Sequence, residues 1–304
     1  MKPDYRKLKP LLWAAVIAFI ATYLLKNARE ILSYGYQFDW TFIPLSLIFV
    51  LLAYLLNIAI WIGIASHYGA HASWLSHARI WSVSRLGRYV PGKIATIYLR
   101  VDGYESAHRS KAGIALYIET ASSLISVCFF ILVFSALGFV ALSPLHLTLI
   151  AAALAALLLL SSGPFLRKFF SRFKSLGSLS PPKTRADAAL LMKVVGLQTV
   201  VMTLHGASLL LAILAFTSIS PALIVEITVF YYFAGLMGML ALFAPAGIGV
   251  REAVLVGLLQ TLMPLPIAVV SVALIRLLTV IAELLLSGTF VLLAKRKPSA
   301  SGES

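Results

Sequence analysis

The sequence predicts an all-α membrane protein, a polytopic bundle whose helices cross the bilayer about seven or eight times. Hydrophobic residues make up 61% of the 304 residues, whereas charged residues make up 12%. Several continuous apolar runs exceed the roughly 18 residues that mark a membrane-spanning helix. These runs do not alternate apolar and polar residues, which disfavours a transmembrane barrel. We therefore expect a single integral membrane domain over 1–304, with the bundle at 10–294.

The net charge of +14 predicts the topology of the chain rather than a nucleic-acid partner. Cytoplasmic loops of multi-pass proteins accumulate Lys and Arg. The basic N-terminus, the basic loop 163–188 and the basic tail 295–304 are therefore expected to be cytoplasmic. We therefore expect both termini on the cytoplasmic side of a prokaryotic plasma membrane, and we expect no nucleic-acid partner.

The apolar runs predict the membrane spans in chain order. The first, at 11–25, follows a basic start like a signal peptide, but no convincing cleavage site of small residues follows, so we expect it to be retained. Further spans are predicted at about 41–66, 113–142, 145–162, 190–217, 222–243 and 266–294. Between them, 67–112 carries seven basic residues and is expected to be cytoplasmic, although its middle is unusually apolar. The remaining stretch, 244–265, is predicted to be a broken or re-entrant segment.

Two motifs, which we predict to be two broken or re-entrant segments of the bundle, place helix-breaking residues beside basic residues, one in each half of the chain. The first motif is SRLGRYVPGKIATIYLR (84–100), and the second is APAGIGVRE (244–252). Backbone broken at membrane depth is tolerated only where protein or a water-filled cavity surrounds it. A helix that restarts there directs its N–H groups and positive dipole end at the cavity. Paired interruptions of this kind point to a transport site and suggest a two-half pseudo-repeat.

A simpler interpretation of the first motif remains open. Arg85, Arg88 and Arg100 could be topology markers on an amphipathic surface helix. The similar break in the second motif favours the binding interpretation, in which basic residues and freed N–H groups hold the same anion.

Ionisable residues inside the predicted spans are expected to face the bundle interior. Glu119 lies in one span, and Arg276 and Glu283 lie seven residues apart on one face of the last span. We expect Arg276 to pair with Glu119 or Glu252. Glu283 is expected to meet Arg251 or an arginine of the first motif.

Three roles for these charges remain open. Arginines could clamp a lipid phosphate with their planar forks. Glu119 and Glu283 could relay protons that drive transport, or the charges could form structural ion pairs. His205 is interpreted as a hydrogen-bonded core residue, and the aromatic run FYYF (230–233) as a packing or interface girdle.

The sequence offers no sign of nucleotide, metal or disulfide chemistry. It contains neither a dinucleotide-binding nor a Walker phosphate loop, so no cofactor and no ATP-driven step are expected. His67, His71 and His77 lack a nearby carboxylate that would complete a zinc site, so we predict no metal. Cys128 is the single cysteine of the chain.

The two motifs, with Glu119 and Arg276, resemble those of the lysylphosphatidylglycerol synthase transmembrane region family, and the resemblance covers about 10–294. It implies a helix bundle that moves, or helps to move, a polar-headed lipid between leaflets. Bifunctional relatives carry a soluble aminoacyl-transferase domain after the membrane region. With ten residues after Ala294, we expect no such domain here.

We therefore predict a lipid flippase that works without ATP on an anionic or phosphate-linked lipid, such as an aminoacyl-phospholipid or a polyprenyl-linked glycolipid. The alternatives are a membrane transferase, for which Glu119 would be the general base, and an accessory subunit of a separate synthase or glycosyltransferase. A homodimer is left open. The predicted substrate-binding residues are Arg85, Arg88, Pro91, Gly92, Lys93, Glu119, Pro245, Gly247, Gly249, Arg251, Glu252, Arg276 and Glu283.

Overall fold

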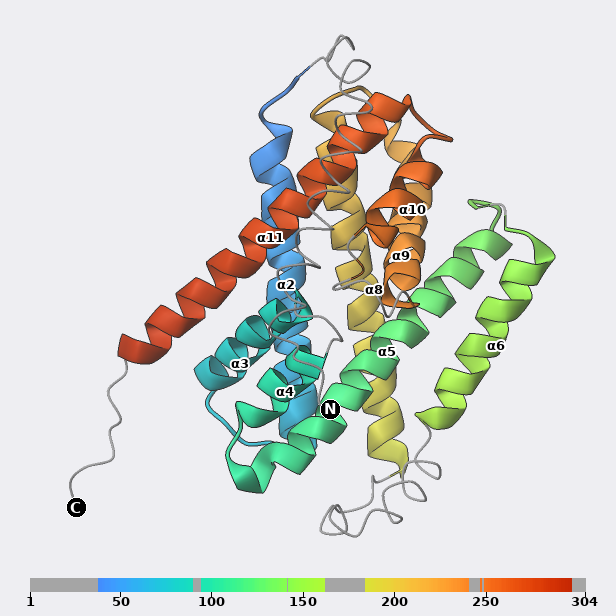
Figure 1. The fold of residues 1–304 in the computed structure, drawn as a ribbon. Coiled ribbons are helices and arrows are strands. Elements are labelled where there is room, and N and C mark those ends of the chain that lie inside the picture. Colours follow the sequence, from blue (N-terminus) through green and yellow to red (C-terminus); the bar gives the residue numbers. More distant parts are fainter. Residues whose placement is uncertain are drawn as a thin grey trace, which may run out of the picture. The chain divides into compact units, whose positions relative to one another are not determined.

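The computed structural model describes residues 38–89, 94–140, 142–161, 184–240, 247 and 249–296. In this part of the chain all regular secondary structure is helical, which confirms the predicted all-α class (Figure 1). The α-helices are α2 (Phe42–His67), α3 (Trp74–Leu86), α4 (Ile94–Asp102), α5 (Arg109–Ala136), α6 (Pro144–Leu160), α8 (Thr184–Leu214), α9 (Ile224–Leu240), α10 (Val250–Leu259) and α11 (Leu265–Arg296). Short 3-10 turns precede or follow them at η1 (Gly87–Tyr89), η2 (Ser106–His108) and η4 (Pro221–Leu223).

Five helical segments of the described chain are long and apolar enough to cross a bilayer, which identifies a multi-pass membrane protein. They are Phe42–His67, Ser106–Ala136, Ala188–Leu214, Pro221–Leu240 and Leu265–Lys295. A further apolar helix, α6, has 17 residues, slightly fewer than the roughly 20 that a span needs. The predicted first span, 11–25, lies outside the described residues. The number of crossings therefore stays a prediction.

A glycine explains where α5 ends, and the observed start of α8 shortens a predicted loop. Helix α5 stops at Ala136, six residues before the predicted end, because Gly138 adopts a φ of +81°. The N–H of Phe139 then donates to the carbonyl of Phe134 (3.0 Å), as expected after a left-handed glycine at a helix end. Helix α8 begins at Thr184, so the predicted basic loop 163–188 is shorter than expected at its C-terminal end.

The chain divides into two compact units. The first takes in the described residues of Met1–Val50, Leu86–Ala95 and His205–Ile281. Within it, the Ser46 hydroxyl of α2 donates to the carbonyl of Ser208 in α8 at 2.8 Å. Helix α9 lies alongside α10 (Figure 1).

The second unit takes in the described residues of Leu51–Arg85, Thr96–Leu204 and Ala282–Ser304. Helices α5 and α6 run side by side there, joined by a hydrogen bond from the Tyr117 hydroxyl to the carbonyl of Leu160 (3.0 Å) (Figure 1). Gln198 of α8 donates to Asn57 of α2 at 3.3 Å.

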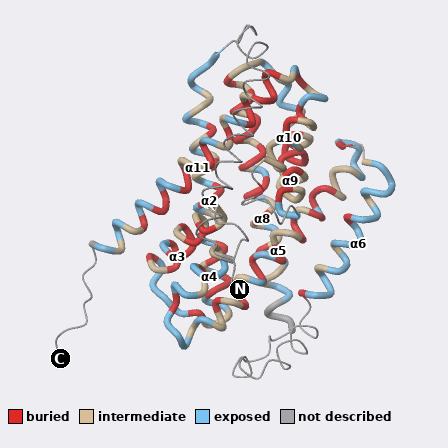
Figure 2. Tube along the Cα trace, in the orientation of Figure 1, coloured by how far each residue is buried: buried red, intermediate tan, exposed pale blue. Residues whose placement is uncertain are grey.

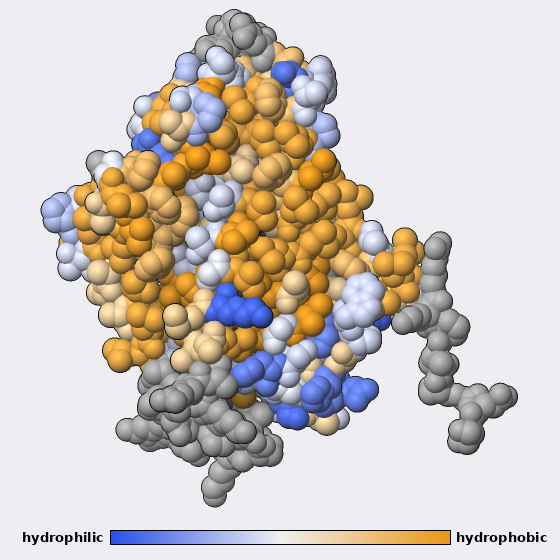
Figure 3. All heavy atoms as spheres, turned by 180° about the vertical axis from the view of Figure 1, so that it is seen from behind, coloured by the Kyte–Doolittle hydropathy of each residue, from blue (hydrophilic) through white to orange (hydrophobic). Residues whose placement is uncertain are grey.

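Large apolar side chains remain exposed along the outer faces of the helices. Helix α6 is the clearest case, since Ile150 alone among its residues is buried (Figure 2). Hydrophobic residues also cover most of the face seen in Figure 3. An extensive apolar surface of this kind fits a protein whose solvent is lipid.

Close packing of α8 against α9 generates a first prediction. A Cβ at Gly206 would lie 1.7 Å from Oγ1 of Thr228, whereas a Cβ at Gly196 of the same helix would meet open space. We expect Gly206→Ala to lower the free energy of unfolding by about 1–3 kcal/mol, because the added methyl overpacks the contact. Thermal unfolding of the purified protein measures the effect. Gly196→Ala is the matched control, and an equal loss in both variants would contradict the packing.

Candidate functional site

The glycines of the second motif allow α10 to start directly against α9. Gly247 and Gly249 both adopt positive φ values, +69° and +88°, which side chains disfavour. A Cβ at Gly247 would lie 2.5 Å from the carbonyl oxygen of Gly238, and a Cβ at Gly238 would lie 2.9 Å from the Cβ of Arg251. The close approach explains why the motif is rich in glycine, and it fixes the starting position of Arg251.

Glu252 holds the beginning of α10 and contacts α11. One carboxylate oxygen accepts a hydrogen bond from the N–H of Gly249 at 2.8 Å, which caps the helix. The other oxygen lies 3.6 Å from Nε of Arg276 on α11. The predicted pairing of Arg276 with Glu252 is therefore confirmed.

Two tyrosine rings lie against arginine guanidinium groups in the first unit. The guanidinium of Arg251 lies 4.5 Å from the ring centre of Tyr231 on α9. Tyr89, in the first motif, is contacted by Arg276 at 5.5 Å and by its neighbour Arg88 at 5.1 Å. Aromatic faces attract such cations, and the attraction grows when the pair is shielded from water. We call Arg88, Arg251, Arg276 and Glu252, with these tyrosines, the arginine cluster.

The arginine cluster confirms that residues of the two motifs come together in the first unit. Tyr89 of the first motif contacts Arg276, and Arg276 pairs with Glu252 of the second. The positive charges of Arg88, Arg251 and Arg276 lie near enough to repel one another.

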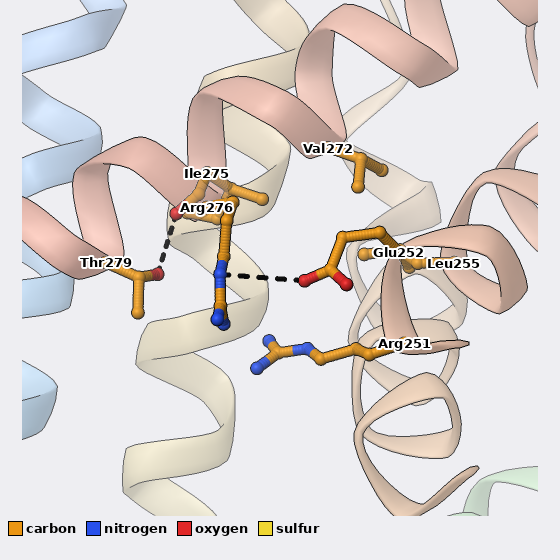
Figure 4. Close-up of a pocket in the computed structure, with 7 residues that line it drawn as sticks. All are labelled: Arg251, Glu252, Leu255, Val272, Ile275, Arg276 and Thr279. Carbon is orange, nitrogen blue, oxygen red and sulfur yellow. Dashed lines mark hydrogen bonds and ion pairs between the residues drawn. The ribbon is translucent and has the colours of Figure 1, made fainter. Parts of the chain in front are cut away.

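A small pocket lies beside these side chains. Its lining residues are Arg251, Glu252, Leu255, Val272, Ile275, Arg276 and Thr279. Figure 4 shows the guanidinium groups of Arg251 and Arg276 reaching toward each other from α10 and α11. Nη1 and Nη2 of Arg276 are buried and have no hydrogen-bond partner among the described residues. Buried donors normally have partners, and an oxyanion would supply them.

A second group of charges, in the second unit, centres on the buried pair of Arg100 and Glu119. Arg100 is 2% exposed and donates from Nη1 to Oε2 of Glu119 at 2.8 Å. Its Nε donates to Oγ of Ser84 at 2.6 Å, and its guanidinium lies 4.4 Å from the ring centre of Trp61. The other oxygen of Glu119 accepts from Trp81 at 2.8 Å. Neither carboxylate oxygen of Glu119 is left without a donor.

Glu283 is the other buried carboxylate of this unit. It accepts a hydrogen bond from the Tyr54 hydroxyl at 3.1 Å and lies 3.6 Å from Nε of Arg85. The guanidinium of Arg85 lies 5.0 Å from the ring of Tyr54 and 5.1 Å from that of Trp81. The prediction that Glu283 meets an arginine of the first motif is therefore confirmed.

A buried chain of hydrogen bonds supports the end of α4. The indole N–H of Trp61 can only donate, so the Tyr104 oxygen accepts it at 3.0 Å. The Tyr104 hydroxyl also lies within hydrogen-bond distance of Nδ1 of His77, at 2.5 Å.

The structure divides the predicted site residues between the two units. The first unit holds Arg88, Gly247, Gly249, Arg251, Glu252 and Arg276, and the second holds Arg85, Glu119 and Glu283. Pro91, Gly92, Lys93 and Pro245 lie outside the described residues. Tyr89 and Trp81 were not predicted, and Tyr231, predicted as a packing or girdle residue, also carries Arg251. Arg100, interpreted as a possible topology marker, is instead buried and paired.

Fold and site together define a multi-pass, all-α membrane protein with charged residues buried among its helices. A family model, the lysylphosphatidylglycerol synthase TM region, matches residues 11–287. The chain therefore belongs to this family, which confirms the resemblance seen in the motifs and supports a function related to membrane lipids. No match is found among curated proteins.

The paired group generates a second prediction. Arg100→Met should lower the free energy of unfolding by about 3–5 kcal/mol, because it leaves the Glu119 carboxylate buried without its cation. Adding Glu119→Gln should restore much of the loss, since the uncompensated charge is then removed. Chemical denaturation of the single and double variants measures both effects.

Arg109→Met is the control, because the exposed pair of Arg109 with Asp102 (2.7 Å) should contribute at most about 1 kcal/mol. If Arg100→Met is no more harmful than Arg109→Met, the buried pair has no structural role.

Proposed function

We propose that this protein moves a lipid with a phosphate-containing head between the leaflets of a prokaryotic plasma membrane, without ATP. The observation that carries the proposal is the arginine cluster. Buried donors of Arg276 lack protein partners among the described residues, and Arg251 faces the same pocket. The planar guanidinium group matches phosphate oxygens in bidentate geometry, so a phosphate satisfies both requirements.

The lining of the pocket suits a charged group, because Arg251 and Arg276 both border it. In this proposal the acyl or prenyl chains stay in the surrounding bilayer while the head is bound. The N-terminal end of α10, held by Glu252, adds a positive dipole end beside Arg251.

The state of Glu119 favours transport over group transfer. As the predicted general base of a transferase, Glu119 would have to accept a proton from a substrate. Its two oxygens instead accept hydrogen bonds from Trp81 and Arg100. A substrate would have to displace one of these donors before either oxygen could accept its proton. The membrane transferase and the accessory subunit remain as alternatives. Product formation by the purified protein would indicate the transferase, and a wild-type protein that neither forms product nor translocates the lipid would indicate the accessory subunit.

A third prediction tests the arginine cluster directly. Purified protein is reconstituted in vesicles with a lipid phosphate that carries a fluorophore on its acyl chain, and translocation is followed by quenching from outside. Arg276→Gln and Arg251→Gln should each slow translocation about tenfold or more, because each removes charge-assisted hydrogen bonds to the phosphate. Arg276→Lys should recover only part of the rate, since it keeps the charge and loses the fork.

Arg109→Gln serves as the matched control, because its side chain is 49% exposed and lies outside the arginine cluster. Normal translocation by both Arg251→Gln and Arg276→Gln would show that the site is misplaced. Formation of a labelled glycolipid or aminoacyl lipid by the purified protein alone, from an activated donor, would establish the transferase instead.

A further inference from the structure

Helices α3 and α4 are too short to cross a bilayer and lie antiparallel in the second unit. They have 13 and 9 residues, against the roughly 20 that a span requires. Arg100 of α4 donates to Ser84 of α3, and Gly103 after α4 lies against Ile80 of α3. The contacts therefore run in opposite directions along the two helices (Figure 1).

Contacts with α2 measure how far α3 reaches along a membrane span. Trp61, six residues before the end of α2 at His67, bonds Tyr104 and through it His77 of α3. Tyr54, thirteen residues before His67, contacts Arg85 at the end of α3. At a rise of about 1.5 Å per residue, these levels are about 9 Å and about 20 Å from the end of α2.

Helix α11 gives similar distances, measured along its own axis from the end of the span. Ser287 lies eight residues before the end of the span at Lys295, and its hydroxyl donates to the carbonyl of Ser82 at 3.0 Å. Glu283 lies twelve residues before Lys295 and pairs with Arg85. These levels are about 12 Å and about 18 Å from the end of the span.

Helix α5 supplies a third measure. Glu119 lies eight residues after Lys111, the last basic residue before the apolar run of α5, and it bonds Trp81 of α3 and Arg100 of α4. This level is about 12 Å from Lys111. Three spans therefore agree that α3 lies alongside their interior turns, from about 9 Å at His77 to about 18–20 Å at Arg85, measured along the spans from their ends.

The outward face of α4 is apolar. A face in contact with water is expected to be polar. Ile97 and Tyr98 are 54% and 61% exposed, and their neighbour Leu99 is exposed as well. The charged residue of this turn, Arg100, faces inward at 2% exposure. Arg79 is the exposed cation of α3, and its long side chain can extend toward the membrane surface.

We infer that α3 and α4 form a re-entrant element that enters the membrane from the side of His67, Lys111 and Lys295, and that Ile97, Tyr98 and Leu99 contact lipid acyl chains. The element replaces the cytoplasmic assignment predicted for this part of 67–112. It keeps Arg85 beside interior turns of α2 and α11, where Glu283 and two aromatic rings hold it. The inference does not depend on lipid transport.

Spin labelling tests the inference, because the chain has a single cysteine. In a Cys128→Ser background, nitroxide labels are placed by Ile97→Cys and Tyr98→Cys in reconstituted bilayers. Leu52→Cys on the exposed side of α2 is the lipid-facing control, and Glu105→Cys after α4 is the water-facing control. Collision rates with oxygen, which enters lipid, and with a water-soluble nickel chelate are measured for each.

Labels at 97 and 98 should match Leu52→Cys, with frequent oxygen collisions and few nickel collisions. Nickel collisions as frequent as those at Glu105→Cys would overturn the inference. Should the cysteine variants fail to fold, wild-type protein is cross-linked to a phospholipid that carries a diazirine on its acyl chain. Adducts on 97–99 support the inference, and adducts on α2 without any on 97–99 contradict it.

Discussion

The high cost of an unpaired charge within a membrane protein underlies the arrangement of both units. In the second unit, Arg100 and Glu119 satisfy each other and are further held by Ser84 and Trp81. In the first unit, Glu252 lies 3.6 Å from Nε of Arg276, and the terminal nitrogens of that guanidinium have no protein partner among the described residues. Buried donors without partners cost free energy. The arrangement around Arg100 and Glu119 therefore suits a structural ion pair, and the arrangement around Arg276 suits a ligand.

The backbone of the second motif makes the arginine cluster available. Gly247 and Gly249 allow a turn that other residues would strain, and Glu252 caps the helix that the turn begins. Arg251 is consequently anchored at the first turn of α10, with Tyr231 beneath its guanidinium. The motif therefore contributes geometry through its glycines and charge through its arginine, which explains why both occur within a few residues.

Hydropathy predicted the long spans to within a few residues, because lipid demands continuous apolar length. The predicted 41–66 and 266–294 correspond to Phe42–His67 and Leu265–Arg296. The end of α5 was missed because one glycine, Gly138, stops the helix within an apolar run. Pairing rules limited the partner of Arg276 to Glu119 or Glu252, since few carboxylates lie in the apolar spans, and the structure shows that the partner is Glu252. They could not predict the cation–π contacts of Tyr89 and Tyr231. An aromatic residue that contacts a cation has the same local sequence pattern as one that packs in a core.

Solid-state NMR offers the most direct examination of the central claim that the arginine cluster holds a lipid phosphate. Protein labelled with ¹⁵N at arginine is reconstituted with a phosphate-headed lipid, and the dipolar coupling between guanidinium nitrogen and ³¹P is recorded. The account predicts a coupling typical of direct contact, which Arg276→Lys weakens and Arg109→Lys leaves unchanged. A wild-type sample without such a coupling, or one whose coupling persists when Arg251 and Arg276 are both replaced by lysine, would contradict it.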